Sequence, residues 1–548
     1  MAIEDTERPI VSETEMRWGS DLVARVIRDL GIKYIALNPG ASYRGLHDSL
    51  VNYLGNHDPQ MILTLHDEHA VAVAHGYAKV TGQPMAVALH SNVGLMHASM
   101  AIFNAFCDRV PVLMFGGTGP MDANQRRPWI DWLHTTADQA SLIRPFTKWD
   151  DQPVSPEAAV RSIARAYRLA VSQPSAPTYI CLDYALQEGP LPDGFTLPGL
   201  GGMTAPPPAL PDPSQVSEAL GHLKRAERPL ILLGRVSRDE QDWASRVALA
   251  EALNAVVLTH QEFPAAFPSG HPLHVLPLTS HRVAEAQRLV READVILSLG
   301  WLDLDGTLRE AGTSRERATI ISATNDQYLH GAWSKEHFEF PLTTIDIVTE
   351  PDAAVRALLG AVDAGPGTYA PVRAEPWAHA EPLEPAPRDV LSYGWAADAL
   401  QEAAGDREMT LVRVPNGWAY CRTPIAGPLD YLGNDGGEGL GSGPGLAVGA
   451  ALGLRGSGRV PVAVIGDGDF CMGANALWTA AHYSLPMLVI VLNNATYLND
   501  EVHQNNIAKR RGRPAENAWI GQHMEGPPVD LAGMARAQGL VGIGPVTG

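Results

Sequence analysis

The stretch Gly466-Asp467-Gly468-Asp469 and the later pair Asn493-Asn494 limit what this chain can fold into, because each follows an apolar run. The first run, 461–465, is short and rich in β-branched residues, and the second covers 487–492. Residues 472–483 between them can form a helix. The segment therefore predicts a strand–helix–strand unit of an α/β fold, with a polar cluster after each strand.

These polar clusters favour a diphosphate group bound through a metal ion. Gly466 and Gly468 let the backbone turn sharply and approach a ligand, and a helix start favours phosphate oxygens. Asp467 would repel a diphosphate unless a divalent cation lay between them, and Mg²⁺ accepts carboxylate, amide, carbonyl and phosphate oxygens. Asn494 follows Asp467 by 27 residues, the length of one helix and one strand, so both side chains are expected at one edge of adjacent parallel strands.

The spaced motif GDG…NN, with its strand–helix–strand context, resembles that of the thiamine diphosphate enzymes of the acetolactate synthase, benzoylformate decarboxylase and pyruvate decarboxylase group. The resemblance implies thiamine diphosphate and Mg²⁺ as cofactors. The implied metal ligands are Asp467, Asn494 and the carbonyl of Thr496. The implied cofactor-binding residues at this end are Gly466, Gly468, Asp469, Asn494 and Thr496. A GDG taken alone would also suit a glycine turn in another nucleotide-like fold.

The N-terminal part alternates apolar runs with helix-like segments, which predicts a doubly wound parallel sheet; the runs are 33–37, 61–65, 85–89 and 110–115. In the family this domain binds the aminopyrimidine ring, and an acid after the second strand protonates N1′. Asp67 lies nine residues before Gly76 of Gly-Tyr-Ala, which is the family's usual register, whereas Glu68 has the usual side chain. Both are candidates, with Glu68 slightly preferred. Two solvated carboxylates at a helix start are the alternative.

A glycine-rich loop, 436–445, resembles the family segment that bends the cofactor into a V. Leu440 is then the aliphatic residue under the two rings, and the carbonyl of Glu438 accepts a hydrogen bond from N4′. A core position is the alternative for Leu440. The turn Asn38-Pro39-Gly40 matches the cofactor-binding turn after the first strand.

Proton transfer has two further candidates. His90, in Leu89-His90-Ser91 after the third strand, resembles the Leu-His-Ser of benzoylformate decarboxylases, and an imidazole with a pKa of about 6.5 exchanges protons near neutral pH. A histidine that caps the strand is the alternative. Asp500 follows the metal site where decarboxylases of the family tend to carry an acid, with a solvated charge as the alternative.

Two proline-rich passages, 190–213 and 365–387, divide the 548 residues into three blocks. We expect an α/β protein of three doubly wound parallel-sheet domains: a pyrimidine-binding domain at 1–190, a central domain at 214–364, and a diphosphate- and Mg²⁺-binding domain at 388–548. The central block has apolar runs at 229–233, 255–259, 295–299 and 318–322. Some relatives hold ADP or FAD there, and Arg235 and Arg238 follow the first of these strands.

Composition narrows the class of protein further. A formal net charge of −20 argues against nucleic acid as a partner. No apolar run reaches the roughly 18 residues of a membrane span, and the acidic N-terminus is unlike a signal peptide. Four scattered cysteines suit reduced thiols, so a cytoplasmic enzyme without a membrane partner is expected.

The expected activity is C–C bond cleavage or formation on a 2-oxo acid, as a decarboxylase or carboligase. The alternative is a 2-hydroxyacyl-CoA lyase or an oxalyl-CoA decarboxylase-like enzyme acting on an acyl-CoA, and a remote alternative is a catalytically silent relative. The family pairs the first domain of one chain with the last domain of another across each cofactor. A homodimer or homotetramer is therefore expected.

Overall fold

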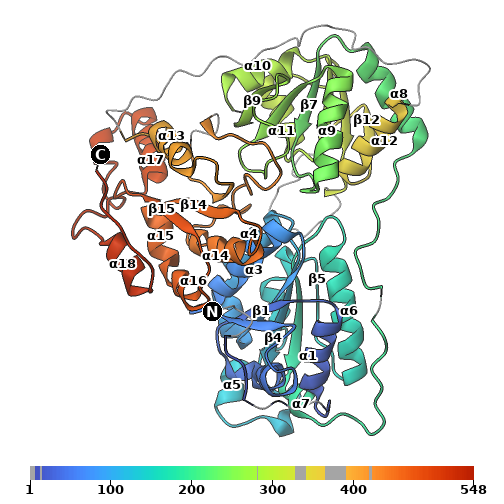
Figure 1. The fold of residues 1–548 in the computed structure, drawn as a ribbon, viewed down its shortest axis with the longest axis vertical. Helices are drawn as coiled ribbons and strands as arrows, with labels where there is room; N and C mark the ends of the chain where they lie inside the picture. The colour runs from blue at the N-terminus through green and yellow to red at the C-terminus, as the bar shows by residue number, and fades with distance from the viewer. Residues whose placement is uncertain are drawn as a thin grey trace.

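The structure is a computed structural model that describes residues 6–547 except 11, 13–14, 201, 281, 327–340, 364–390 and 419–421. Three parallel sheets, each with flanking helices, follow one another along the described chain. Figure 1 shows them as three lobes: N-terminal in blue and cyan, central in green and yellow, and C-terminal in orange and red. The α/β architecture of three doubly wound domains expected from the sequence is confirmed.

The N-terminal sheet has the strand order β2-β1-β3-β4-β6-β5, with neighbouring strands parallel. Its strands are β1 (Tyr34–Leu37), β2 (Gln60–Leu63), β3 (Met85–Leu89), β4 (Val112–Thr118), β5 (Trp149–Asp151) and β6 (Thr178–Asp183). Its helices are α1 (Gly19–Asp29), α2 (Arg44–Asp48), α3 (Asp67–Thr81), α4 (Ser91–Cys107), α5 (Ile130–His134), α6 (Pro156–Val171) and α7 (Tyr184–Glu188). Strands β3 and β4 are buried along their whole length and carry few polar residues, as strands covered on both faces do.

The central sheet has the order β12-β11-β10-β7-β8-β9. Its strands are β7 (Pro229–Leu233), β8 (Val256–His260), β9 (His274–Thr279), β10 (Val295–Leu299), β11 (Thr319–Ala323) and β12 (Ile345–Ile347). Its helices are α8 (Pro213–Arg225), α9 (Glu240–Leu253), α10 (Ala284–Glu292), α11 (Leu304–Ala311) and α12 (Pro351–Asp363). The four apolar runs expected here all form strands, within one residue of the expected ends.

The C-terminal sheet is smaller, with β14 (Val460–Gly466) between β13 (Met409–Arg413) and β15 (Leu488–Leu492). Its helices are α13 (Tyr393–Ala404), α14 (Gly443–Gly453), α15 (Asp467–Gly473), α16 (Leu477–His482), α17 (Leu498–Arg510) and α18 (Leu531–Ala537). Leu492 pairs with Gly466, so the ends of β14 and β15 lie side by side.

The helix expected at 472–483 was wrongly bounded. Helix α15 begins at Asp467, directly after β14, and a 3-10 turn at Ala474–Ala476 separates it from α16. A side chain at Gly473 would lie 2.1 Å from the carbonyl oxygen of Gly441. The glycine needed for that tertiary contact disfavours a continuous helix, and no local sequence pattern predicts this interruption.

Helices α3 and α14 cross at very close range and join the first domain to the last. A Cβ at Gly76 would lie 2.2 Å from the carbonyl oxygen of Leu446, and one at Gly449 would lie 2.0 Å from that of Val73. Only glycine allows the two backbones to approach this closely. The crossing places the start of α3, with Asp67 and Glu68, near the residues that follow β14.

The proline-rich segments and the surface agree with a multidomain protein. The described residues between α7 and α8 form no helix or strand, whereas the segment expected as a linker at 365–387 lies outside the described residues.

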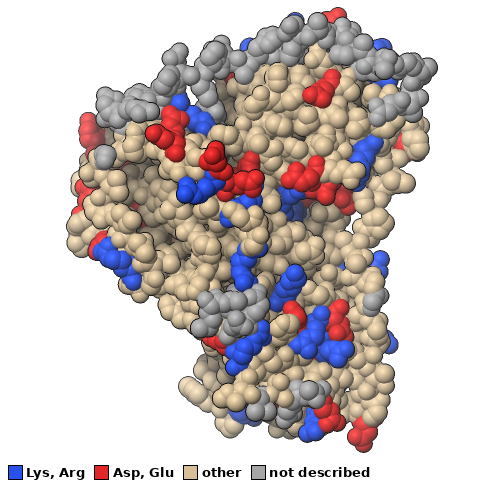
Figure 2. Space-filling model, in the orientation of Figure 1, with Lys and Arg blue, Asp and Glu red and all other residues tan. Residues whose placement is uncertain are grey.

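No described helix is both long and apolar enough to cross a membrane. Figure 2 shows basic and acidic side chains interspersed on the face drawn, with no large basic patch.

Candidate active site

The polar residues after β14 and β15 meet at one edge of the C-terminal sheet. We call residues 466–469 the metal turn. Asp467 is buried; its Oδ1 accepts a hydrogen bond of 2.9 Å from the N–H of Gly468, and its Oδ2 has no hydrogen-bond partner within the described part of the chain. Asn494 Oδ1 accepts a bond of 3.2 Å from the N–H of Thr496. A buried carboxylate oxygen without a partner is costly, and a bound cation removes that cost.

The surroundings of the metal turn also suit a diphosphate. A Cβ at Gly466 would meet nothing within 4 Å, so space is open there, whereas Gly468 is tightly covered by the ring of Tyr497. The hydroxyl of Thr496 donates to Glu501 at 3.0 Å, which leaves the Thr496 carbonyl as its group for a metal. Carboxylate, amide and carbonyl oxygens are a donor set that Mg²⁺ prefers.

Asp469, expected from the sequence as a cofactor-binding residue, has a side chain that contacts protein groups. Its Oδ2 is 2.8 Å from Arg413 Nε, and its Oδ1 accepts a hydrogen bond of 2.7 Å from the N–H of Gly441. The carboxylate is therefore taken up by protein groups. Only the backbone of Asp469 is left to contact a cofactor.

The loop before α14, residues 435–443, is called the glycine loop. Glu438 has φ 53° and Gly441 has φ 99°, so the backbone here takes left-handed conformations. Leu440 is 39% exposed and does not belong to the core, which excludes the alternative considered for it. The N–H of Gly439 donates to Asn104 Oδ1 at 3.4 Å, so helix α4 of the first domain supports the loop.

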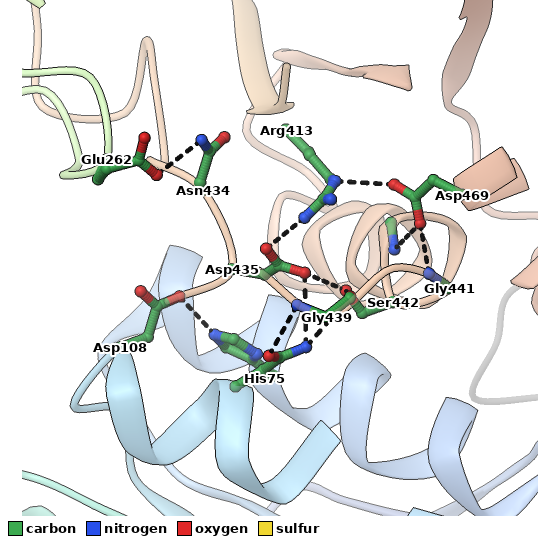
Figure 3. A network of polar contacts seen from close by, with 12 residues as sticks. His75, Asp108, Glu262, Arg413, Asn434, Asp435, Gly439, Gly441, Ser442 and Asp469 are labelled. Atoms are coloured by element: carbon green, nitrogen blue, oxygen red, sulfur yellow. Dashed lines mark hydrogen bonds and ion pairs between the residues drawn. The ribbon is translucent and has the colours of Figure 1, made fainter. Parts of the chain in front are cut away.

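Groups from the other two domains hold the chain just before the glycine loop (Figure 3). Lys79 donates to the carbonyl of Asn434, and Asn434 Nδ2 donates to Glu262 of the central domain at 2.8 Å. Lys79 and His75 also contact Asp108 at 2.6 and 2.7 Å. Although burial opposes its charge, Lys79 and His75 lower the pKa of Asp108 to about 2. The glycine loop is thus held from the first domain through Lys79 and from the central domain through Glu262.

The two acids at the start of α3 have different surroundings. Asp67 is buried, its Oδ1 has no hydrogen-bond partner among the residues described, and its Oδ2 lies 3.4 Å from His97 Nδ1. A Cβ at Gly94 would be 2.4 Å from Asp67 Oδ1, so that oxygen lies against the start of α4. Glu68 is half-buried; burial and, secondarily, the charge of Asp469 raise its pKa. Asp67 therefore faces the first domain's own polar cluster, whereas Glu68 faces the last domain.

His90 precedes α4 in that same cluster. Ser42 Oγ is 3.0 Å from His90 Nδ1 and accepts a hydrogen bond of 2.9 Å from the N–H of Ser91. The buried hydroxyl of Ser42 therefore bridges the N–H of Ser91 and His90 Nδ1, and the tautomer of His90 sets whether it donates to Nδ1 or accepts from it. The ring of His134 lies 4.8 Å from that of His90. Burial and then His134 lower the pKa of His90, while Asp67 opposes the shift.

The turn Asn38-Pro39-Gly40 packs beside His90. A Cβ at Gly40 would lie 2.4 Å from His90 Cβ, and the carbonyl of Asn38 accepts a hydrogen bond from Tyr43. Pro39 and Gly40 line a pocket of about 440 Å³ together with Ala41, Arg44, His47 and Asp48. The structure thus brings Asp67, His90 and this turn together at the carboxyl end of the N-terminal sheet.

Two other groups of candidates lie elsewhere. Asp500 is exposed in the first turn of α17. Arg235 pairs with Asp326 and donates to the carbonyl of Cys107, while burial lowers the pKa of Arg238 to about 10 and its guanidinium donates to Ala78 at 3.3 Å. Both arginines therefore fasten the central domain to the first, so neither supports the ADP or FAD site considered from the sequence.

Several residues of the site were not found by sequence reasoning: Ser42, His97, Asn104, His134 and Arg413. None belongs to a motif quoted from the sequence, although Ser42 follows the turn at Gly40 by two residues and His97 and Asn104 lie on the helix that begins after His90. His97 and Asn104 lie on the face of α4 that meets the candidate residues, but the sequence of α4 is that of an ordinary apolar helix.

Comparison with known families identifies the family of proteins to which the chain with these polar clusters in its first and last domains belongs. Models of the N-terminal TPP-binding domain, the central domain and the C-terminal TPP-binding domain of thiamine pyrophosphate enzymes match residues 17–142, 216–335 and 415–547. The chain belongs to the thiamine pyrophosphate enzyme family. Thiamine pyrophosphate is thiamine diphosphate, so the expected enzyme class and cofactor are confirmed.

This thiamine pyrophosphate enzyme has curated relatives with named activities. It is 28% identical over 463 residues to the benzoylformate decarboxylase of Pseudomonas aeruginosa, covering 80% of each chain. It is 26% identical over 554 residues to the acetolactate synthase isozyme 3 large subunit of Escherichia coli, covering 96% of this chain and 90% of that one.

Solved structures share its fold. The benzoylformate decarboxylase of Polynucleobacter necessarius has a TM-score of 0.79 at 21% identity, covering 96% of this chain and 93% of that one. A thiamine diphosphate-dependent 4-hydroxybenzoylformate decarboxylase of Rhodococcus jostii has a TM-score of 0.73 at 22% identity, covering 95% and 93%. At these identities the likeness bears on the fold.

Proposed function

We propose that this thiamine pyrophosphate enzyme acts on a 2-oxo acid, as a decarboxylase or carboligase. The supporting observation is the polar cluster of the first domain, where a buried acid with an unpartnered oxygen, Asp67, lies beside a histidine, His90, whose Nδ1 is 3.0 Å from the hydroxyl of Ser42. Such a cluster can handle protons next to a bound substrate. The named activities of the relatives, benzoylformate decarboxylase and acetolactate synthase, support the same substrate class.

The residues present fit thiamine diphosphate held through Mg²⁺. Asp467, Asn494 and the carbonyl of Thr496 would hold the metal, and the open space at Gly466 would admit the diphosphate. Leu440 and the carbonyl of Glu438 would support and orient the rings from the glycine loop. When bound, thiamine diphosphate supplies an electron sink for the bond that breaks next to the substrate ketone.

Asp67 rather than Glu68 is the acid that we propose for N1′ of the pyrimidine. Its Oδ1 is buried without a protein partner, whereas Glu68 is half-buried toward Asp469 of the same chain. A buried carboxyl with one open oxygen can donate a proton to, and accept it from, a single ring nitrogen. His90, neutral near pH 7, would carry protons for the substrate.

A second copy of this chain is proposed to cover the glycine loop, in a homodimer or a homotetramer. Three apolar side chains around the loop are solvent-exposed in the single chain: Met100 at 37%, Leu440 at 39% and Met472 at 58%. Met100 packs on Gly439 and Met472 on Gly441, so the three form one exposed apolar strip. Exposed apolar strips of this kind mark interaction sites.

Because Cys181 is buried and Cys471 is partly buried, both as thiols, we also propose a cytoplasmic location.

The test of the proposed function is a panel of 2-oxo acids with aromatic, branched and short aliphatic side chains. The purified protein, supplied with thiamine diphosphate and Mg²⁺, is expected to release CO₂ from at least one of them, and omission of either cofactor should stop the release. Acyl-CoA substrates of similar size serve as the comparison. Cleavage of an acyl-CoA without CO₂ release from any 2-oxo acid would refute the proposal.

The pH dependence of turnover tests His90. If its neutral form is required, kcat/KM falls as the pH decreases through its pKa, and because that pKa is lowered the acidic limb should lie below about pH 6.5. His134→Gln removes the neighbouring imidazole that lowers the pKa of His90 and should move this limb to higher pH. His90→Ala should slow turnover by roughly 100-fold and abolish the limb, while thiamine diphosphate affinity changes little. An unaltered pH–rate profile in His90→Ala would leave His90 with a structural role.

A further inference from the structure

One buried arginine joins the glycine loop to the metal turn. Arg413 ends β13; its Nε is 2.8 Å from Asp469 Oδ2, and its Nη1 forms an ion pair with Asp435 Oδ1. The three side chains are only 10%, 3% and 1% exposed for Arg413, Asp469 and Asp435. Figure 3 shows Arg413 between the two carboxylates, one at the start of the loop and the other in the metal turn.

The second oxygen of each carboxylate holds the glycine loop. Asp469 Oδ1 accepts a hydrogen bond of 2.7 Å from the N–H of Gly441 and a longer one of 3.4 Å from that of Gly443. Asp435 Oδ2 accepts from the hydroxyl of Ser442 and, at 3.4 Å, from Asn104. A displacement of Asp469 therefore acts on the loop both through Arg413 and through the amide of Gly441.

The chemistry of the cluster requires an arginine. Two carboxylates and one cation are buried together, so removal of the cation would leave two uncompensated buried charges. A guanidinium presents donors in a planar fork and meets two acids in different directions, whereas a lysine ammonium is a point charge. Burial disfavours the charged form of Arg413, but the two acids outweigh it and raise its pKa.

We propose that Arg413 is a positioning residue that couples the metal turn to the glycine loop. Occupation of the turn by Mg²⁺ and a diphosphate then tightens the loop that carries Glu438 and Leu440, so one end of the cofactor prepares the site for the other. The inference rests on the proposed diphosphate site at Asp467. It assigns to Asp469 a role in transmission through its side chain.

Hydrogen exchange measured by mass spectrometry tests this coupling, with Mg²⁺ and inorganic diphosphate as the probe, because this probe occupies the turn without supplying rings for the loop. In the wild-type protein the probe should slow exchange in both segment 466–473 and segment 435–443. For the loop we expect a slowing of roughly five-fold or more, the lower end of measured couplings between sites. In Arg413→Met the turn should still be protected, while the loop response is lost.

A matched control is Arg246→Met. Arg246 is fully buried, whereas Arg413 is 10% exposed, and it pairs with Asp352 at 2.6 Å, but it lies in the central domain. The Arg246→Met variant should have a lower thermal unfolding temperature, as Arg413→Met does. It should still show the full slowing of hydrogen exchange in the glycine loop. If Arg413→Met does not fold, Arg413→Lys serves instead; it keeps the charge, reaches only one acid, and should lose most of the response.

The outcomes separate this inference from the proposed function. Protection of neither segment in the wild-type protein refutes the diphosphate site itself, and the coupling with it. Protection of the turn without the loop refutes the coupling alone, as does a full loop response in Arg413→Met or Arg413→Lys. With thiamine diphosphate bound, the near-ultraviolet circular dichroism of the cofactor should also change in the Arg413 variants, since it reports the mutual orientation of the two rings.

Discussion

Asp467→Ala is expected to abolish the Mg²⁺-dependent retention of thiamine diphosphate. The change removes the buried carboxylate whose Oδ2 has no hydrogen-bond partner in the described structure, and with it the negative charge proposed to hold the metal. We expect a loss of at least about 100-fold in affinity, because mutation of groups that merely orient metal ligands already costs 10–100-fold. Calorimetric titration of the metal-free protein with thiamine diphosphate, with and without Mg²⁺, measures this affinity.

The control for this prediction is Asp406→Ala, which removes an exposed carboxylate of the same domain. It should leave the affinity and its Mg²⁺ dependence unchanged. Equal affinity in Asp467→Ala and the wild-type protein would show that the metal turn does not bind the cofactor through Asp467.

The second large effect is expected at the pyrimidine end, where Asp67→Asn should reduce turnover by roughly 100- to 10,000-fold, the range typical of general acid–base groups. The amide nearly preserves the shape of Asp67 but cannot exchange a proton. Glu68→Gln is the matched comparison, one residue away on the same helix, and should cost much less. Steady-state kinetics together with thiamine diphosphate affinity separates a chemical defect from a binding defect.

The reverse order of effects would assign the acid to Glu68, and similar mild effects would show that neither residue has this role. Mixing the inactive Asp67→Asn and Asp467→Ala proteins extends the test to the assembly. If each site is built from the first domain of one chain and the last domain of another, a mixed dimer contains one intact site and recovers part of the activity. A fully active monomer in sedimentation would exclude shared sites.

Local sequence predicted the fold well because most strands are short buried runs ended by polar or glycine residues, although β5 and β15 are only partly buried. In β3, β7 and β10 even the expected ends are the observed ends. The helix after β14 was misplaced because it begins at Asp467, directly after the strand, and because its interruption depends on Gly473 meeting Gly441, a contact across the fold.

The choice between Asp67 and Glu68 shows the same limit. Their helix start was predictable, but two adjacent residues on a helix point about 100° apart, and only the packing of α4 and α14 around α3 decides what each faces. Likewise the sequence marked Asp469 through the motif, and only the structure shows that its side chain pairs with Arg413, the last residue of β13.

The sequence by itself determined the fold class and the family and predicted the two ends of the cofactor site, because glycine turns, strand periodicity and a spaced acid–amide motif are local properties. The tertiary structure alone decided which oxygens remain without partners among the described residues, which hydroxyl contacts His90, and how the glycine loop is held. Those properties depend on contacts between residues far apart in the chain: Ser42 with His90, Asn104 with Gly439, and Arg413 with Asp435 and Asp469. No spacing within the sequence encodes such contacts, since they arise only when three separately folded sheets pack together.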